Sequence, residues 1–542
     1  MWLFLIVWGV YIIMQKIGVQ KQNGFLKSVF VLSVGGIVAK VLGAVYRIPL
    51  TNIVGSYGMG LYQLVFPLFS LLLTISTAGI PVAVSKLVAE KIALGKRCQA
   101  QKVFKTALAM LALLGVAGSL VLFVFAKDIA TLQGNVEATG AYKLIAPSVF
   151  LVCVISAYRG YFQGLMQMEP TALSQIVEQT VKMAVGLYGA ITFMPDVIKS
   201  INFAIFGVTA SEFVAMILLV CIKKFGKKQQ MQPSDIKDDF DVKDTLKKLC
   251  VLCLPVTLSG LIIPLTQLVD SVLVLNLLNL KNATTLYGVW AGPVHSLLNM
   301  PVVLTLGIST AIVPAISNHY AVGDEVGAKN KAIFAIKLTM VVGLPCALGL
   351  ILLAEPITKL LYGGLPAEEI LLAVDMVRVA GVSVLFLSFV QTCTAVLQAG
   401  GRLYAPVVFL FVSTVVKTLL SVVLLSNDNI NVFGAPISSV ICYFVASLGD
   451  LLYIVRVQKT KPNVKDVFAK PLACGVVMTV FLLATRNLCA KFLPNSLCVL
   501  LLVGIGVLSY AVSLLLFKVF DKQEASKVPV VGRFLQKLYQ EK

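Results

Sequence analysis

Residues 34–50 read VGGIVAKVLGAVYRIPL, an apolar run interrupted by two permanent cations, Lys40 and Arg47. A Lys or Arg at the centre of a lone membrane helix costs roughly 2.5–3.5 kcal/mol, so such residues usually face a water-filled cavity or a partner. Seven residues are close to two helical turns, and both side chains therefore point the same way. We expect them to line a shared cavity that binds a negatively charged ligand.

The composition is that of a polytopic membrane protein. Of the 542 residues, 58% are hydrophobic and 13% are charged, whereas a soluble domain has about 25% charged residues. Apolar stretches of about 20 residues, long enough to span a bilayer, recur along the chain. Most of the net charge of +20 lies in short loops and tails, where basic residues set membrane orientation. We therefore do not expect nucleic-acid binding.

We predict an all-α polytopic fold with about fourteen transmembrane helices. Placing both termini in the cytoplasm puts most of the Lys and Arg residues in cytoplasmic segments, and an odd number of spans would disrupt this bias. The predicted segments are an apolar extension with a basic cytoplasmic part (1–23), spans 1–6 (24–222), a cytoplasmic linker (223–248), spans 7–12 (249–457), spans 13–14 (458–520) and a cytoplasmic tail (521–542). The linker is either a hinge between two halves or a simple solvated loop.

An internal repeat supports two six-helix lobes. Gln163 and Lys182 recur 235 positions later as Gln398 and Lys417. The segment GIPVAVS around Pro81 similarly resembles AIVPAIS, 233 positions later. Similar offsets in the same order argue for duplication of a six-helix unit. Because six is an even number, both copies start on the same side of the membrane, and the substrate path is expected between them.

Lys182 and Lys417 are further candidates for the binding site. They lie about eleven and thirteen residues into their helices, too deep to reach the membrane surface easily. A buried ion pair is the alternative for Lys182, because Glu178 lies one helical turn before it. Lys417 has no such neighbour on its own helix, so its partner must come from elsewhere.

Other charged residues within the predicted spans are candidates for binding, gating, anchoring or ion coupling. Lys86 is a candidate for substrate binding or gating, or it reaches the cytoplasmic surface beside Glu90. We interpret Arg159 as a positive-inside anchor and expect Arg378 to pair with Asp375. Coupling to a proton or another monovalent cation would need an acidic residue within a span. The candidates for this coupling are Asp270, Glu212 and Glu178.

Catalytic and metal-binding motifs decide between an enzyme and a transporter. The chain has no glycine-rich phosphate loop, no HExxH motif and no cluster of carboxylates with histidine. We expect neither a metal site nor a cofactor, and we predict a transporter rather than an enzyme. A membrane glycosyltransferase remains the alternative from a different class, since such enzymes can work with few recognisable residues.

Residues 25–91, from FLKSVFVLSVGGIVAKVLG to SKLVAEK, resemble the polysaccharide-biosynthesis branch of the multidrug/oligosaccharidyl-lipid/polysaccharide exporter superfamily. Within it the chain is most similar to the stage V sporulation protein B group, which is related to lipid II flippases. The resemblance implies two six-helix lobes plus two extra helices, in a bacterial plasma membrane. It also implies alternating access that moves an undecaprenyl-pyrophosphate glycan to the outer leaflet.

The resemblance assigns roles to particular residues. Basic residues of the first span bind the anionic headgroup in such flippases, and the KVLG pattern carries that role onto Lys40. Their second basic residue falls at Tyr46, beside Arg47, and their eighth-span arginine falls at Ser296. We expect Lys182 and Lys417 to compensate, unless the substrate differs.

The resemblance also leaves the substrate open. Another undecaprenyl-linked polysaccharide, or a drug exchanged for a cation, is the alternative to a lipid II-type substrate. Expected partners are the lipid-linked anionic glycan, membrane lipids and, as a further candidate, cell-wall synthesis proteins. Transport would draw on the membrane potential or on a monovalent cation.

Overall fold

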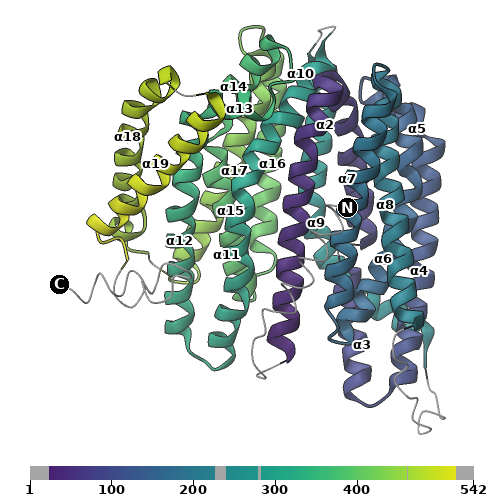
Figure 1. The fold of residues 1–542 in the computed structure, drawn as a ribbon. Coiled ribbons are helices and arrows are strands. Elements are labelled where there is room, and N and C mark those ends of the chain that lie inside the picture. The colour runs from purple at the N-terminus through teal and green to yellow at the C-terminus, as the bar shows by residue number, and fades with distance from the viewer. Residues whose placement is uncertain are drawn as a thin grey trace. The chain divides into compact units, whose positions relative to one another are not determined.

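The structure is a computed structural model that describes residues 24–77, 79–225, 240–278, 282–460, 462–492 and 494–520. These residues form helices and no strands, which confirms the predicted all-α class (Figure 1). The predicted extension 1–23, the tail 521–542 and most of the linker 223–248 lie outside the described residues.

Contacts divide the chain into two compact units, Met1–Gly292 and Pro293–Lys542. The helices of the first unit are α2 (Gly24–Thr77), α3 (Ile80–Ala93), α4 (Arg97–Val124), α5 (Ala126–Leu132), α6 (Thr139–Gly164), α7 (Glu169–Phe193), α8 (Val197–Phe225), α9 (Val242–Leu277) and α10 (Ala283–Val289). Those of the second unit are α11 (His295–Ala321), α12 (Glu325–Leu352), α13 (Ala354–Leu361), α14 (Ala367–Ala380), α15 (Ser383–Ala399), α16 (Ala405–Leu425), α17 (Gly434–Arg456), α18 (Lys470–Phe492) and α19 (Asn495–Leu516).

The boundary between the units follows α10 and does not fall in the predicted linker. Helices α9 and α10 pack against α2 in the first unit. At this contact the Gln63 side chain of α2 donates a hydrogen bond to the Ala291 carbonyl at 2.7 Å. The Asn135 amide, which follows α5, also donates to Thr284 of α10 at 2.9 Å. The division into two six-helix lobes at 223–248 stays a prediction.

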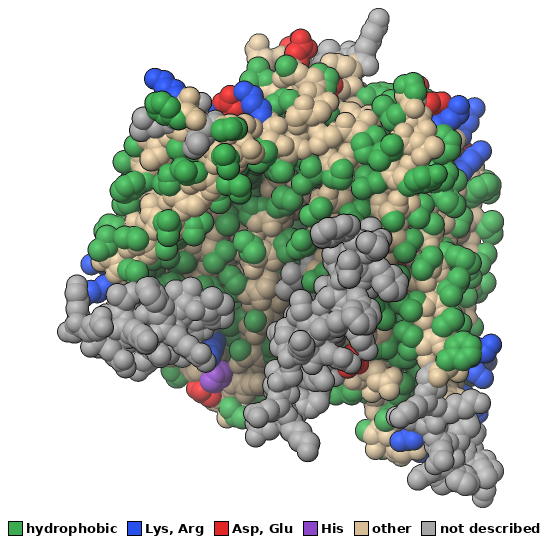
Figure 2. All heavy atoms as spheres, viewed as in Figure 1, with side chains coloured by type: hydrophobic (Ala, Val, Ile, Leu, Met, Phe, Trp, Pro, Cys, Tyr) green, Lys and Arg blue, Asp and Glu red, His purple; other side chains and the backbone are tan. Residues whose placement is uncertain are grey.

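Many of these helices are suited to a membrane. Among the described residues, eleven are long and apolar enough to cross one, or twelve if the bent pair α14 and α15 forms one span. On the face shown in Figure 2, hydrophobic side chains cover the middles of the helices and charged side chains gather near their ends. The chain is therefore a multi-pass membrane protein, and the predicted count of fourteen is not confirmed.

Part of the difference in count comes from α2. It has 54 residues, which at 1.5 Å per residue would extend about 81 Å, far more than the roughly 30 Å of a hydrocarbon core. Two helices meet within it at Gly55, whose φ of 71° and ψ of 178° are open essentially to glycine alone. The candidate membrane stretch Val38–Ala93 runs across this kink and is counted once.

Close packing between α2 and α7 positions the candidate residues of the first unit. A Cβ atom on Gly35 would lie 2.6 Å from the Cβ of Ala172, and one on Gly43 would lie 3.1 Å from Gln179 Oε1. Small residues at such contacts let membrane helices approach closely. Helix α7 also packs against α8, so that α7 lies between α2 and α8.

Buried hydroxyl groups connect three helices of the second unit. Thr305 of α11 donates to Ser388 of α15 at 3.0 Å, and Thr339 of α12 lies 2.7 Å from Thr392 of α15. Helices α18 and α19, the predicted spans 13 and 14, pack against α12 and α13. An ion pair of 2.9 Å between Arg486 and Glu355 joins α18 to α13.

Candidate functional site

Lys182 is at the centre of the candidate site in the first unit. It projects from α7 toward α2, where its Nζ lies 5.4 Å from the ring centre of Tyr46 and 5.7 Å from that of Phe66. The face of an aromatic ring is negative and attracts a cation at this range. The ring of Tyr62 extends this aromatic wall, 4.7 Å from Phe66. Lys182 is thus held by rings in the interior of the helix bundle.

An ion pair lies beside Lys182 on α6 and α7. Arg159 Nη2 is 2.9 Å from Glu178 Oε2, and Arg159 Nε donates to Ser174 Oγ at 3.0 Å. Both charged side chains are largely buried, at 16% and 17% exposed. The Gln179 amide also donates to Glu178. Glu178 therefore pairs with Arg159 across two helices, which replaces our interpretation of Arg159 as a surface anchor.

Glu212 brings a second carboxyl group to this site. It lies on α8 and is 7% exposed, and its Oε2 has no hydrogen-bond partner among the described residues. It interacts electrostatically with Glu178, Arg159 and Lys182, and Lys182 interacts in addition with Arg47. We call Arg47, Arg159, Glu178, Lys182 and Glu212 the central cluster. It contains three basic and two acidic groups.

The two cations of the first span lie on one stripe of α2. Gly36 and Gly43 are on the same stripe as Lys40 and Arg47 by helical spacing, and both glycines lie near glutamine side chains of α7. The predicted shared face therefore turns toward α7. Arg47 is partly buried, whereas Lys40 is exposed, seven residues before it.

Two other candidates in the first unit lie on other helices. Lys86 is exposed on α3, which packs against α4, α6 and α9. Asp270 is 6% exposed on α9 and interacts electrostatically with Tyr287 of α10. The central cluster, in contrast, is built from α2, α6, α7 and α8.

Lys417 belongs to the second unit. It is 4% exposed on α16. Asp450, on the neighbouring α17, is 1% exposed and accepts a hydrogen bond of 3.4 Å from Thr394. Its Oδ1 has no hydrogen-bond partner among the described residues. The sequence analysis did not select Asp450, although it is the only acidic residue within an otherwise apolar helix, α17.

Lys337 is a buried cation that the sequence analysis missed. It is 4% exposed on α12, and its Nζ lies 5.4 Å from the ring centre of Phe520. The signal was present, because Lys337 interrupts the apolar run AIFAIKLTMVV. By contrast, the predicted pair of Arg378 with Asp375 is confirmed, at 3.0 Å.

A metal site would need several His, Cys, Asp or Glu side chains close together. No group of three or more His, Cys, Asp or Glu side chains is placed to do so in the part of the chain that the structure describes. The central cluster itself offers two carboxylates among three cations, an arrangement suited to an anion or a proton rather than to a multivalent metal ion.

Family models match most of the chain. The polysaccharide biosynthesis protein family matches residues 25–319, more than half of the chain, and the MatE family matches residues 255–423. Stage V sporulation protein B of Bacillus subtilis is 26% identical over 525 residues, which cover 95% of this chain and 99% of that protein. The lipid II flippase MurJ of the same organism is 25% identical over 465 residues, 80% of this chain and 83% of that one.

Solved structures share the fold. A structure of the lipid II flippase MurJ in an inward closed conformation matches with a TM-score of 0.69, covering 90% of this chain and 98% of that one at 17% identity. An inward-facing MATE family transporter matches with a TM-score of 0.66, covering 78% and 95% at 16% identity. Together with the sequence matches, these findings show a transporter rather than an enzyme. The chain belongs to the polysaccharide biosynthesis protein family of the multidrug/oligosaccharidyl-lipid/polysaccharide exporter superfamily, in the group of stage V sporulation protein B and related to the MurJ flippases.

Proposed function

We propose that this chain is a flippase for a lipid-linked cell-wall precursor of the lipid II type. It moves an undecaprenyl-pyrophosphate glycan from the inner to the outer leaflet of a bacterial plasma membrane by alternating access, with both termini in the cytoplasm. The central cluster carries this proposal, because it places three cations inside the helices of one unit against two carboxylates. The relatedness to a lipid II flippase supports it.

The chemistry of the central cluster suits a pyrophosphate. Guanidinium and ammonium groups make short, charge-assisted hydrogen bonds to phosphate oxygens. Arg159 is already held by Glu178 at 2.9 Å, so Arg47 and Lys182 are the cations that the ligand would engage. Lys40, exposed on the same stripe of α2, would meet the headgroup first. The Lys182 ammonium group lies 5.4 Å from the ring centre of Tyr46 and would exchange this ring for a phosphate.

The driving force follows from charge. Moving two negative charges outward across an inside-negative potential of 100 mV is favourable by roughly 4.6 kcal/mol, at about 2.3 kcal/mol per charge. A monovalent cation is a second possible source of energy. Glu212 is the best placed of the acidic candidates, because it is buried beside Lys182 and keeps an oxygen without a hydrogen-bond partner among the described residues. Asp270 is the other candidate, whereas Glu178 is engaged by Arg159.

The polyprenyl tail would stay in lipid while the headgroup crosses. We assign part of its groove to α18 and α19, the helices of the predicted spans 13 and 14. Membrane lipids and cell-wall synthesis proteins are the further partners that we propose.

A drug antiporter driven by a cation is the second candidate, favoured by the MatE match to residues 255–423. Organic cations call for a surplus of acidic groups in the binding cavity. The central cluster has the opposite balance, which favours an anionic substrate. A flippase for another undecaprenyl-linked polysaccharide differs only in the glycan.

The test is a flipping assay with the purified full-length chain in vesicles that contain defined lipid-linked substrates. We expect Lys40→Ala to abolish flipping of undecaprenyl-pyrophosphate glycans while the yield of folded protein stays near normal. Lys96→Ala, which removes an exposed cation from the turn between α3 and α4, is the matched control and should flip normally. Retained transport by Lys40→Ala would refute the role of Lys40. Transport of organic cations with no movement of any lipid-linked glycan would favour the antiporter.

A further inference from the structure

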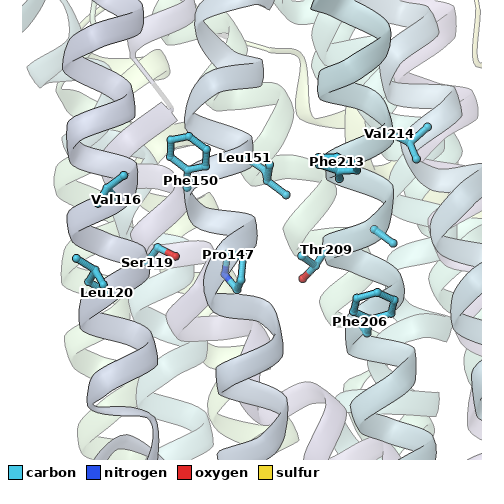
Figure 3. Close-up of a pocket in the computed structure, with 11 residues that line it drawn as sticks. Val116, Ser119, Leu120, Pro147, Phe150, Leu151, Phe206, Thr209, Phe213 and Val214 are labelled. Atoms are coloured by element: carbon cyan, nitrogen blue, oxygen red, sulfur yellow. The ribbon is translucent and has the colours of Figure 1, made fainter.

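A cavity opens on the outside of the first unit, away from the aromatic wall of Lys182. It has a volume of about 530 Å³ and lies between α4, α6 and α8. Figure 3 shows Ser119 and Leu120 on α4, Pro147 on α6, and Thr209 on α8 around it. The rim residues Leu120, Phe206 and Phe213 are 57%, 40% and 50% exposed. We call this cavity the α4–α6–α8 groove.

The walls of the groove offer no polar group to a ligand in spite of two hydroxyl residues. Ser119 donates its hydrogen bond to the Ala146 carbonyl at 2.7 Å, and Thr209 donates to the Leu144 carbonyl at 2.6 Å. Both hydroxyl groups therefore bind the backbone of α6 and present their carbon atoms to the groove. A polar ligand would lose its hydrogen bonds to water on entering it, whereas a hydrocarbon chain would not.

The length of the groove matches one leaflet of a bilayer. Along α8 it extends from Phe206 to Val214, which at 1.5 Å per residue is about 12 Å. Half of the hydrocarbon core of a membrane is roughly 15 Å thick. The three helices are candidate membrane spans, so the groove faces lipid and can hold one extended hydrocarbon chain of a single leaflet.

Positive charge lies at one end of the groove. Lys143 is one helical turn before Pro147 on α6 and is exposed. Its Nζ lies 5.9 Å from the ring centre of Phe123, near the end of α4. Lys127 follows at the start of α5 and is also exposed. In a bilayer this end meets the headgroup layer, where exposed cations favour anionic headgroups.

We propose that the α4–α6–α8 groove is a binding site for an anionic phospholipid, with one acyl chain in the groove and the phosphate at Lys143. The orientation that the sequence predicts puts this end in the outer leaflet. The site lies on the back of the central cluster, since Glu212 points into the unit at 7% exposed while the next residue, Phe213, is 50% exposed and lines the groove. A bound chain would hold α8 in place from outside. This inference is independent of the glycan that the chain transports.

The experiment counts lipids on the delipidated full-length chain by native mass spectrometry during titration with phosphatidylglycerol or phosphatidylcholine. We expect one phosphatidylglycerol to bind before the others. Ala210→Phe, which fills the groove, should reduce this first bound lipid at least fivefold, and Val116→Trp at the rim serves if Ala210→Phe does not fold. Lys143→Gln should reduce binding of phosphatidylglycerol by a similar factor and leave phosphatidylcholine unchanged.

Matched controls separate the groove from general lipid contact. Leu113→Phe enlarges a side chain of α4 that is 73% exposed outside the groove, and Lys491→Gln removes an exposed cation from the end of α18. Both should bind phosphatidylglycerol like the unchanged protein. Equal binding by Ala210→Phe and Val116→Trp would overturn the site, and equal affinity for both lipids would overturn the anionic headgroup. Displacement of the first lipid by undecaprenyl phosphate would instead assign the groove to the substrate tail and overturn this proposal.

Discussion

Lys182 and Lys417 are related by the repeat, yet their surroundings differ. Lys182 is partly buried against the rings of Tyr46 and Phe66, whereas Lys417 is 4% exposed. Each unit also has a buried acidic residue on the following helix, Glu212 on α8 and Asp450 on α17. Both carboxyl groups keep one oxygen without a hydrogen-bond partner among the described residues. The duplicated element is thus a lysine on one helix and a buried carboxyl group on the next.

The ion pair between Arg159 and Glu178 has no counterpart at the repeat-related positions. The positions 235 residues after Arg159 and Glu178 are Thr394 and Ser413. Thr394 donates a hydrogen bond to Asp450, and Ser413 donates to the Leu410 carbonyl. Where the first unit places an ion pair of 2.9 Å, the second therefore places two hydroxyl groups. Hydroxyl groups are satisfied by nearby carbonyls, whereas a buried charge needs an opposite charge or a ligand.

The second unit has its own ionic cluster, but at the ends of its helices. Glu355 at the start of α13 is 2.9 Å from both Lys359 and Arg486, and 3.7 Å from Arg378. These side chains are between 31% and 55% exposed. From this comparison we infer that headgroup binding depends on the first unit, while the charges of the second unit mainly attach helices to one another.

The largest expected difference between the two units is in headgroup binding, when Lys182 or Lys417 is replaced by a neutral residue. Lys182→Gln should weaken binding of the pyrophosphate headgroup about tenfold or more, which is about 1.4 kcal/mol or more. Lys417→Gln should weaken headgroup binding by less than about threefold, because the Lys417 side chain is 4% exposed within the second unit and has little access to a ligand. Titration of the purified variants with undecaprenyl pyrophosphate measures both.

The amount of folded protein provides the control for this pair of variants. If both variants lose binding equally while remaining monodisperse in size-exclusion chromatography, the two units contribute alike and the comparison fails. If Lys182→Gln loses only its yield of folded protein, then the lysine is part of a structural ion network and not a ligand for the headgroup.

Breaking the ion pair should have an intermediate effect, on stability. Glu178→Gln leaves the largely buried Arg159 without its carboxylate, and it should destabilise the chain by about 1–3 kcal/mol. The repeat-related Ser413→Ala should cost about 1 kcal/mol or less. Unfolding in mixed micelles titrated with a denaturing detergent compares the two.

A second substitution tests whether the loss comes from the pair itself. Replacing Arg159 by Gln in the Glu178→Gln background should recover part of the lost stability, because no charge then remains buried alone. Equal losses for Glu178→Gln and Ser413→Ala would show that the ion pair adds nothing beyond a hydroxyl group.

Much of this contrast could be predicted from sequence, because cations within apolar runs are visible without a structure. The helical class followed from the length of the apolar stretches, and the pairing of Arg378 with Asp375 followed from their spacing along one helix. Spacing along a helix could not reveal partners on other helices. The sequence therefore suggested that Glu178 pairs with Lys182. In the structure Glu178 pairs with Arg159, 19 residues away on α6.

Other features depend on packing that no local pattern records. Asp450 and Lys337 were visible as isolated charges, but only the structure shows that both are almost fully buried. The attachment of α9 and α10 to the first unit depends on contacts such as the one between Gln63 and Ala291, 228 residues apart. The polar composition of the linker suggested that the two lobes divide there. Composition carries no information about contacts between residues that are far apart in the sequence.

The smallest expected effect concerns Glu355. A hydrogen bond from Lys359, with Arg486 and Arg378 nearby, lowers the pKa of the Glu355 carboxyl group below its usual value. An unfolded glutamate titrates near 4.3, so the stability that the folded carboxylate contributes is present above about pH 4.3 and is lost as the pH falls through its lowered folded-state pKa. Glu355→Gln should therefore flatten the fall in thermal stability on acidification below about pH 4.3.

Glu368→Gln, an exposed acidic residue in the first turn of α14, is the control for Glu355→Gln and should leave the acid profile unchanged. Headgroup binding at neutral pH should be unaffected by either variant, because the cluster around Glu355 attaches α13 to α18 and belongs to the second unit. Loss of binding in Glu355→Gln at neutral pH would show that the ends of the helices in the second unit also reach the substrate. That result would contradict our inference that the charged residues of the first unit bind the headgroup while those of the second unit only attach helices to one another.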